Sequence, residues 1–208
     1  KKNDEIIISE MEHHSNILPW QMLKNNKGIK IRYIPVLDNG MLNINKIDSL
    51  INTKTKLISI IHMSNVLGII NPIDTIISKA EKYDIPIIID AAQSISHQKI
   101  NVKKLKCDFL MFSGHKIMGP TGVGVLYINK KYNKMLDPFL RGGNMIKEVN
   151  KISSSWNDAP WKFEAGTANI AQVLGLATAI DYLNKLGIIN IKKHNNQLLE
   201  YLLLKMKI

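Results

Sequence analysis

Short apolar segments alternate with helical patterns between residues 5 and 112, and this alternation most constrains the fold. The apolar segments are Glu5–Ile8, Ile29–Val36, Lys56–His62, Ile85–Ile89 and Asp108–Phe112. Helical patterns lie between them, at about residues 17–25, 44–51 and 72–83. Strands that alternate with helices form parallel sheets joined by right-handed crossovers. We therefore predict an α/β fold with a mainly parallel sheet flanked by helices.

The pattern changes after a further apolar run at 123–128. A loop with glycines follows at 138–145, and an aromatic-rich irregular segment follows at 156–167. Residues 169–186 have the pattern of a long helix. The last stretch, 191–208, is an amphipathic helix that stops without a capping glycine, which suggests an end cut through a larger protein.

The composition limits the classes of protein to consider. With 208 residues, 45% of them hydrophobic, the chain can form one sizeable core. No apolar run is long enough to cross a bilayer and the first residues do not resemble a signal peptide, so we expect no membrane association. The single cysteine excludes an intramolecular disulfide. The net charge of +11 is compatible with nucleic-acid binding, but the lysines are scattered, which favours compositional bias.

A lysine stands between an apolar strand and a glycine-rich turn. Lys116 follows the strand that ends at Phe112, and Gly119, Gly122 and Gly124 allow sharp turns or close approach to a ligand. Open α/β sheets bind ligands at the carboxyl edge of their strands. An ordinary surface lysine fits this stretch equally well, so the lysine alone does not decide the function.

Two further strand ends carry polar residues. Asp90 closes the most apolar strand, where an unpaired carboxylate is costly, so it is either a helix N-cap or the partner of a cationic ligand. Asn65 follows the strand that ends at His62, as a turn residue or a ligand donor. Because the strands are parallel, these residues and Lys116 should share one edge of the sheet.

Two adjacent histidines, His13 and His14, separate the first strand from the first helix. Neighbouring side chains in an extended segment point apart, and no other His or Cys stands nearby, so no metal site is expected. We expect one ring to be functional and the other structural. Ser15 or Asn16 is the expected cap of the helix that follows.

The residues at the strand ends fit the chemistry of one cofactor. A lysine forms a Schiff base with an aldehyde cofactor. An aspartate keeps a pyridinium nitrogen protonated, so that the ring accepts electrons. Lys116 and Asp90 are 26 residues apart (116 − 90), which is one strand–crossover–strand step. With an aromatic ring such as that of His13 to stack on the cofactor, these are the functions that pyridoxal phosphate (PLP) requires.

Six motifs, which span nearly the whole chain, resemble one known family. They are Glu12-His13-His14-Ser15-Asn16, Ser64-Asn65-Val66-Leu67-Gly68, Asp90-Ala91-Ala92-Gln93, Ser113-Gly114-His115-Lys116, Gly119-Pro120-Thr121-Gly122 and Phe163-Glu164-Ala165-Gly166-Thr167. Together they resemble the PLP-dependent cysteine desulfurases of the SUF type (group II), in the class V aminotransferase superfamily. The resemblance implies the large domain of fold-type I PLP-dependent transferases over residues 1–187, truncated at its N-terminus. Residues 188–208 would begin a helix that leads to a C-terminal small domain outside this chain.

The resemblance implies a role for each matching residue near the cofactor ring. Lys116 would be the Schiff-base lysine, and His13 would stack on the pyridine ring and serve in proton transfer. Asp90 would pair with the pyridine nitrogen. Gln93 would contact the phenolic oxygen of the cofactor, and Asn65 would approach its substrate side.

The same resemblance assigns the phosphate group of the cofactor. Ser113 and His115 would hold this phosphate, and Thr167 would reach the phosphate of the partner subunit in a homodimer. Positions expected to be structural or adjacent to the substrate are His14, His62, Lys162 and Arg141. Arg141 stands where the family often has glycine, so that loop is expected to differ in detail.

Three functional segments of the family are expected outside this chain. A phosphate-binding Gly-Thr or similar segment lies upstream of the first strand in the family, and a sulfur-accepting cysteine and a carboxylate-binding arginine lie downstream of residue 208. Cys107 is no substitute for that cysteine, because it begins a buried strand where a small apolar residue is the ordinary interpretation. These residues alone are not expected to complete turnover.

The implied activity converts L-cysteine to L-alanine and an enzyme persulfide. The sulfur would pass to an acceptor protein of the SUF system for iron–sulfur cluster assembly. A selenocysteine lyase, a kynureninase or an aminotransferase would share Lys116 and Asp90. A non-catalytic basic nucleic-acid-binding protein is the alternative from a different class. A bacterial cytoplasm, and as an alternative a plastid-type organelle, fits the composition.

Overall fold

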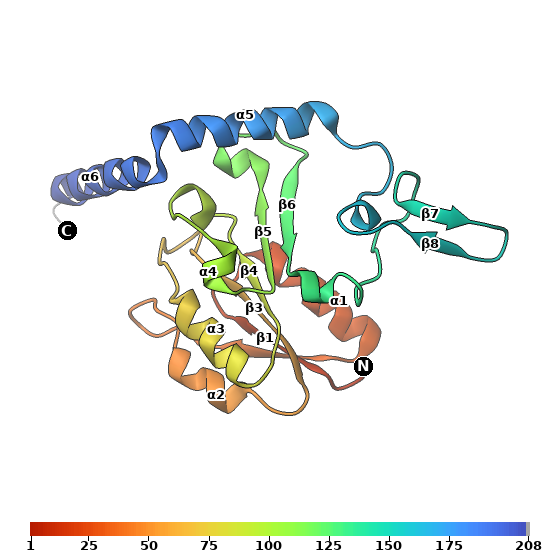
Figure 1. The fold of residues 1–208 in the computed structure, drawn as a ribbon. Helices are drawn as coiled ribbons and strands as arrows, with labels where there is room; N and C mark the ends of the chain where they lie inside the picture. Colours follow the sequence, from red (N-terminus) through yellow and green to blue (C-terminus); the bar gives the residue numbers. More distant parts are fainter. Residues whose placement is uncertain (207–208) are drawn as a thin grey trace.

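The computed structural model describes residues 1–206, which are built on a six-stranded sheet (Figure 1). The strands are β1 (Glu5–Ser9), β2 (Lys30–Ile34), β3 (Thr55–Ile61), β4 (Ile87–Asp90), β5 (Phe109–Ser113) and β6 (Gly124–Ile128), in the order β2-β1-β3-β4-β5-β6. Every pairing is parallel except that of β6, which runs antiparallel to β5. The predicted α/β fold with a mainly parallel sheet is confirmed.

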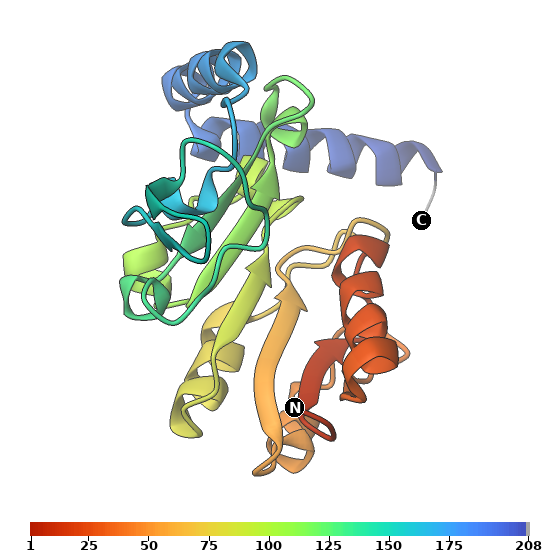
Figure 2. The same ribbon diagram turned by 90° about the vertical axis from the view of Figure 1, so that its right-hand side faces the viewer.

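Helices cover both faces of this sheet (Figure 2). The helix α1 (Leu18–Lys27) packs on one face, whereas α2 (Ile47–Leu50), α3 (Ile73–Lys82) and α4 (Val102–Leu105) pack on the other. Each parallel connection crosses from one end of the sheet to the other, which brings the carboxyl ends of β1 to β5 to the same edge. Within residues 1–206, no helix combines the length and apolar character that crossing a membrane requires.

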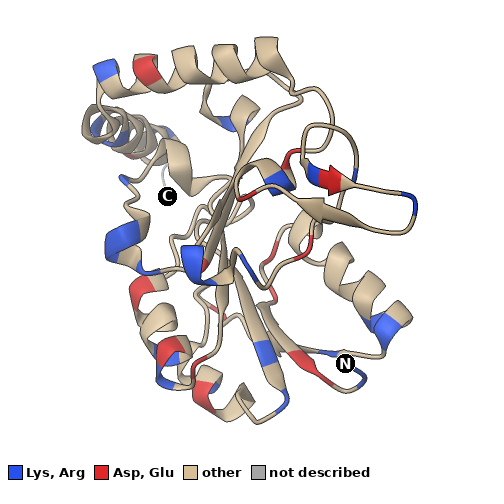
Figure 3. Cartoon of the chain, turned by 45° about the vertical axis from the view of Figure 1, so that its right-hand side comes forward, with Lys and Arg blue, Asp and Glu red and all other residues tan. Residues whose placement is uncertain are grey.

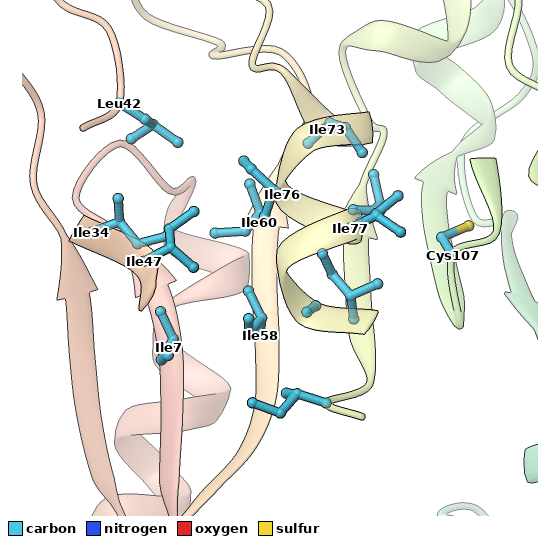
Figure 4. Packing of buried hydrophobic residues seen from close by; sticks show 14 of the residues in the cluster. Ile7, Ile34, Leu42, Ile47, Ile58, Ile60, Ile73, Ile76, Ile77 and Cys107 are labelled. Atoms are coloured by element: carbon cyan, nitrogen blue, oxygen red, sulfur yellow. The ribbon is translucent and has the colours of Figure 1, made fainter. Parts of the chain in front are cut away.

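Isoleucine fills the core because β-branched side chains pack well on a pleated surface. Alternate side chains of β1 point to opposite faces of the sheet. Ile7 packs in the cluster with residues of α3, whereas Ile6 and Ile8 pack with residues of α1. Figure 4 shows Ile7 with Ile58 of β3 and Ile76 of α3 in the first of these clusters. Such strands, apolar on both faces, are typical of covered parallel sheets.

The chain beyond β6 contains two long helices and a hairpin. α5 (Ile170–Leu186) ends at Gly187, whose φ of 81° lies in the left-handed region, and α6 (Ile188–Met206) begins directly after it. The hairpin of β7 (Ile146–Val149) and β8 (Ser154–Trp156) projects away from the sheet (Figure 1). The sequence did not predict this hairpin, and α6 begins at Ile188, before the start at 191 that the amphipathic pattern alone predicted. Residues 207 and 208 of that prediction lie outside the described residues.

The predicted cap of the first helix is wrong. The N-cap of α1 is Ile17, which makes no side-chain cap hydrogen bond. The Asn16 side chain is buried and binds Glu12 and Ser59 instead. The Asn16 side chain is therefore used in hydrogen bonds to Glu12 and Ser59 and does not cap the helix. The helix begins without a side-chain cap, with Pro19 in its first turn.

Candidate active site

A cavity of about 540 Å³ lies at the carboxyl ends of β1, β3, β4 and β5. Seven of the eight predicted site residues line it: His13, Asn65, Asp90, Gln93, Ser113, His115 and Lys116. The eighth, Thr167, is exposed on the segment before α5 and does not line this cavity. Pockets for small molecules have volumes of a few hundred to about 1,000 Å³, so the cavity is large enough for a cofactor.

The pairing of the strands explains why these residues meet. Asp90 is the register partner of Ile61 on β3 and of Met111 on β5. The acid thus lies between two strand ends, and Lys116 follows the second of them. The segments after β1 and β3 contribute His13 and Asn65 from the other side.

Asp90 is a buried acid that has no ion-pair partner among residues 1–206. The residue is 3% exposed, and one carboxylate oxygen accepts a hydrogen bond of 2.9 Å from Ala92 N. Among residues 1–206, no Lys, Arg or His forms an ion pair with it. Burying a carboxylate without a counter-charge is costly. A protonated ring nitrogen of a bound ligand would supply that charge, so the acid fits a cationic ligand group.

Lys116 is held on a short 3-10 helix, Gly114–Ile117, at the end of β5. The ends of this turn are fixed by backbone bonds, from Gly114 N to Val123 O (2.9 Å) and from Gly119 N to Gly114 O (3.0 Å). Ile117 is buried in a cluster with residues of α5. The half-buried lysine is therefore presented to the cavity by a rigid element.

Two glycines allow the chain to fold this tightly around the lysine. A Cβ at Gly114 would lie 2.9 Å from Val123 Cγ1, and one at Gly119 would lie 2.8 Å from Gly114 O. Both distances are shorter than real Cβ contacts, so any larger residue would move the turn that carries Lys116.

The His13 ring is fixed by the residue two positions later. Its Nδ1 accepts a hydrogen bond from Ser15 N at 3.2 Å and lies 2.8 Å from Ser15 Oγ. Because a backbone N–H can only donate, Nδ1 is the acceptor, and a neutral ring carries its proton on Nε2. Ser15 was expected only as a possible helix cap; its spacing of two residues from the histidine is a signal for this contact that the sequence prediction missed.

The four positions expected to be structural or adjacent to the substrate lie outside this cavity. The Arg141 guanidinium stacks over the Trp156 ring at 5.7 Å, and Lys162 Nζ donates to a backbone carbonyl at 2.9 Å. Burial lowers the pKa of His62. His14 is exposed, with its ring 5.9 Å from that of His13. Within residues 1–206, no group of His, Cys, Asp and Glu is suited to holding a metal ion.

The positive charge is not gathered at one place. Figure 3 shows Lys and Arg on helices and loops on several sides of the molecule. Proteins that bind nucleic acid through charge typically present a basic patch or stripe. The distribution agrees with the interpretation of the net charge of +11 as compositional bias.

Comparisons with known proteins agree with this fold. Residues 1–207 match the family described as aminotransferase class-V. A cysteine desulfurase of Wigglesworthia glossinidia brevipalpis is 50% identical over 209 residues, which are 100% of this chain and 51% of that protein. The structure of a cysteine desulfurase from Thermococcus onnurineus NA1 is 39% identical with a TM-score of 0.92, over 97% of this chain and 50% of that one.

A more distant structural neighbour, C-DES, is 26% identical with a TM-score of 0.81, over 89% of this chain and 50% of that one. It is described as a cystine C–S lyase, and one of its structures holds glycine covalently linked to the PLP cofactor. The chain spans about half the length of each of these relatives. The sequence match over nearly every residue, together with the same fold, shows that this chain belongs to the class V aminotransferase family.

Proposed function

We propose that the protein containing this chain is a PLP-dependent cysteine desulfurase, which converts L-cysteine to L-alanine and an enzyme persulfide. The observation that carries this proposal is the placement of Lys116 and the unbalanced Asp90 carboxylate on one cavity. The cysteine desulfurases at 39–50% identity support the choice of substrate. The cysteine that receives the sulfur would lie outside this chain, because Cys107 is fully buried.

The residues of the cavity fit PLP. Lys116 would hold the cofactor covalently, and Asp90 would face its ring nitrogen. Ser113 and His115 would bind the phosphate, and Gln93 would bind the phenolic oxygen. When bound, PLP supplies a ring that accepts electrons from the substrate α-carbon.

The side chains of this chain would then orient the reactants and handle protons. The Asp90 carboxylate would accept a hydrogen bond from the ring nitrogen and keep that nitrogen protonated. Lys116 Nζ would lie beside the substrate α-carbon and could accept or return a proton there. His13 would stack on the ring and offer Nε2–H toward the substrate, because Nδ1 is occupied by Ser15. Asn65, which lines the same cavity, would approach the substrate side of the cofactor.

We further propose the SUF type and a homodimer as the finer assignment. Thr167 is exposed and outside the cavity, as expected of a residue that serves the partner subunit's cofactor. In this assignment residues 1–187 form the large domain and 188–208 lead to the small domain. The sulfur would pass to a SUF acceptor protein for iron–sulfur cluster assembly, in a bacterial cytoplasm or a plastid-type organelle.

The proposal is tested with the full-length protein, PLP and L-cysteine. We expect a visible cofactor absorption band and one alanine formed for each sulfur released. Lys116→Ala should abolish the alanine, whereas Lys130→Ala, an exposed lysine of another turn, should keep wild-type rates. Cystine as the preferred substrate would instead indicate a lyase. A colourless protein, or full activity of Lys116→Ala, would rule out the PLP mechanism.

A further inference from the structure

Glu12 is a buried acid directly before His13, and its carboxylate binds donors from three elements. Oε1 accepts hydrogen bonds from Ser9 Oγ at 2.5 Å and from Ile61 N at 2.9 Å, and Oε2 accepts one from Asn16 Nδ2 at 2.6 Å. Ser9 ends β1, Ile61 ends β3, and Asn16 ends the 3-10 turn after His13. One carboxylate thus ties the segment that carries His13 to two strand ends.

Asn16 extends this network and fixes its direction. Its Oδ1 accepts hydrogen bonds from Ser59 Oγ at 2.7 Å and from Trp20 Nε1 at 3.3 Å. Because an indole N–H can only donate, the amide oxygen must face Trp20, and the amide nitrogen must face Glu12. The side chain is 1% exposed, so water does not compete for these bonds.

Stability alone does not account for an acid at this position. Glu12 is 6% exposed, and none of the ion pairs among residues 1–206 includes it. Burial raises the pKa of Glu12 to about 7, against the lowering effect of its three donors. A well-packed apolar side chain often stabilises such a site as well as a buried charge does. The role of the acid is therefore to hold Ser9, Asn16 and Ile61 in a fixed arrangement.

We propose that Glu12 is a positioning residue, which places the His13 ring over the cofactor by tying residues 13–16 to the ends of β1 and β3. Glu12 itself does not line the cofactor cavity, whereas His13 and Ile61 do. Ser15 sets the rotation of the ring, and Glu12 sets the position of the backbone from which the ring extends. This inference rests on the proposed function, because it requires a cofactor in the cavity.

The test uses the full-length protein with PLP and the variants Glu12→Gln, His13→Ala and their combination. The amide of Gln would present its NH₂ group to the NH₂ group of Asn16, which is held by Trp20, so at least one bond of the network is lost. We expect Glu12→Gln to change the circular dichroism of the visible cofactor band and to lower kcat roughly 10- to 100-fold. In the His13→Ala background, the same substitution should change both quantities by less than about twofold.

The matched control is Glu5→Gln, which alters another buried acid at the far end of β1. It should lower Tm while leaving the visible band unchanged. The inference is overturned if Glu12→Gln lowers Tm but leaves that band unchanged, or if its effect is equally large in the His13→Ala background. If Glu12→Gln does not fold, Ser9→Ala, which removes one hydrogen bond to the Glu12 carboxylate, is tested in its place, and the same changes in the visible band and kcat are measured. A wild-type protein without the band would overturn the proposed function, and this inference with it.

Discussion

Glu5, the first residue of β1, and Glu12, three residues after its last, are buried carboxylates, and within residues 1–206 only Glu5 of the two is paired with a cation. Arg32 Nε and Nη2 each lie 3.0 Å from a Glu5 oxygen, and Asn52 Nδ2 adds a hydrogen bond of 2.8 Å. These contacts, led by the Arg32 hydrogen bond, lower the pKa of Glu5. Burial raises the pKa of Glu12 to about 7 from an ordinary value of 4.5.

The two acids should therefore give opposite pH dependences of stability. Glu12 binds its proton more tightly in the folded state, so its contribution to the free energy of unfolding is lost as the pH rises from about 4.5 to about 7. Glu5 binds its proton less tightly, so its contribution is lost as the pH falls below about 4.5. Urea unfolding from pH 3.5 to 8 measures both effects.

In these titrations, Glu12→Gln should remove a loss of up to about 3 kcal/mol above pH 4.5. Glu5→Gln should instead remove part of the loss in acid. Equal slopes for the wild type and Glu12→Gln between pH 4.5 and 7 would show that the acid titrates normally.

Asp90→Asn should separate catalysis from stability. The amide oxygen still accepts the Ala92 hydrogen bond, but the negative charge that faces the ring nitrogen is gone. We expect kcat of the full-length protein to fall roughly 100- to 1,000-fold, with no loss of Tm because an unbalanced buried charge is removed.

Asp108→Asn is the control for this change. Asp108 is also buried, but it pairs with Lys131 and accepts a hydrogen bond from Ile87 N. Its substitution should lower Tm and preserve kcat. Wild-type kcat in Asp90→Asn would mean that the charge of this acid is not used in the reaction.

Gly119→Ala should disturb the turn that presents Lys116. The added Cβ would lie 2.8 Å from Gly114 O and 3.0 Å from Leu176 Cδ1, so the turn must shift. We expect a destabilisation of about 1–3 kcal/mol and weaker retention of PLP, measured by denaturation and by dialysis. Gly143→Ala, whose Cβ meets nothing within 4 Å, should match the wild type in both. Tight PLP retention by Gly119→Ala would show that the turn tolerates the side chain.

Cys107 should be unreactive in the folded protein. Its side chain is fully buried, and burial raises the pKa of the thiol to about 11, so little thiolate exists at neutral pH. Mass spectrometry after iodoacetamide treatment should find the Cys107 peptide unmodified under native conditions and alkylated in guanidinium. Cys107→Ala should cost about 1 kcal/mol and preserve sulfur transfer. Rapid native alkylation would contradict the assignment of Cys107 to the core.

Much of the fold could be predicted from periodicity, because β1, β3, β4 and β5 are short, mainly apolar runs and α3 and α5 follow helical spacing. Parallel topology then brought Asp90, Lys116 and His13 to one edge without any knowledge of distances. The direction of β6 was not predicted, since an apolar run does not reveal whether its partner is parallel. The role of Asn16 was not predicted either, because its partners Ser59 and Glu12 meet it only in the folded chain.

The hydrogen bonds of Glu12 could not be predicted from the sequence either. Glu12 belongs to one of the six motifs, but the sequence does not reveal that its carboxylate binds Ser9, Asn16 and Ile61. Ile61 contributes a backbone N–H, which every residue except proline possesses. Hydrogen bonds of this kind depend on strand register, and register is set by the whole sheet.

The place of β1 between β2 and β3 has a consequence for how the protein is made. β1 pairs with β3 through Glu5 and Thr55, and β3 pairs with β4 through Ile61 and Asp90, so these contacts join distant parts of the chain. Folds with high contact order form slowly, because long loops must close first. A nascent chain on the ribosome thus cannot form the complete cofactor cavity until β5 and Lys116 have left the ribosome and β5 has paired with β4.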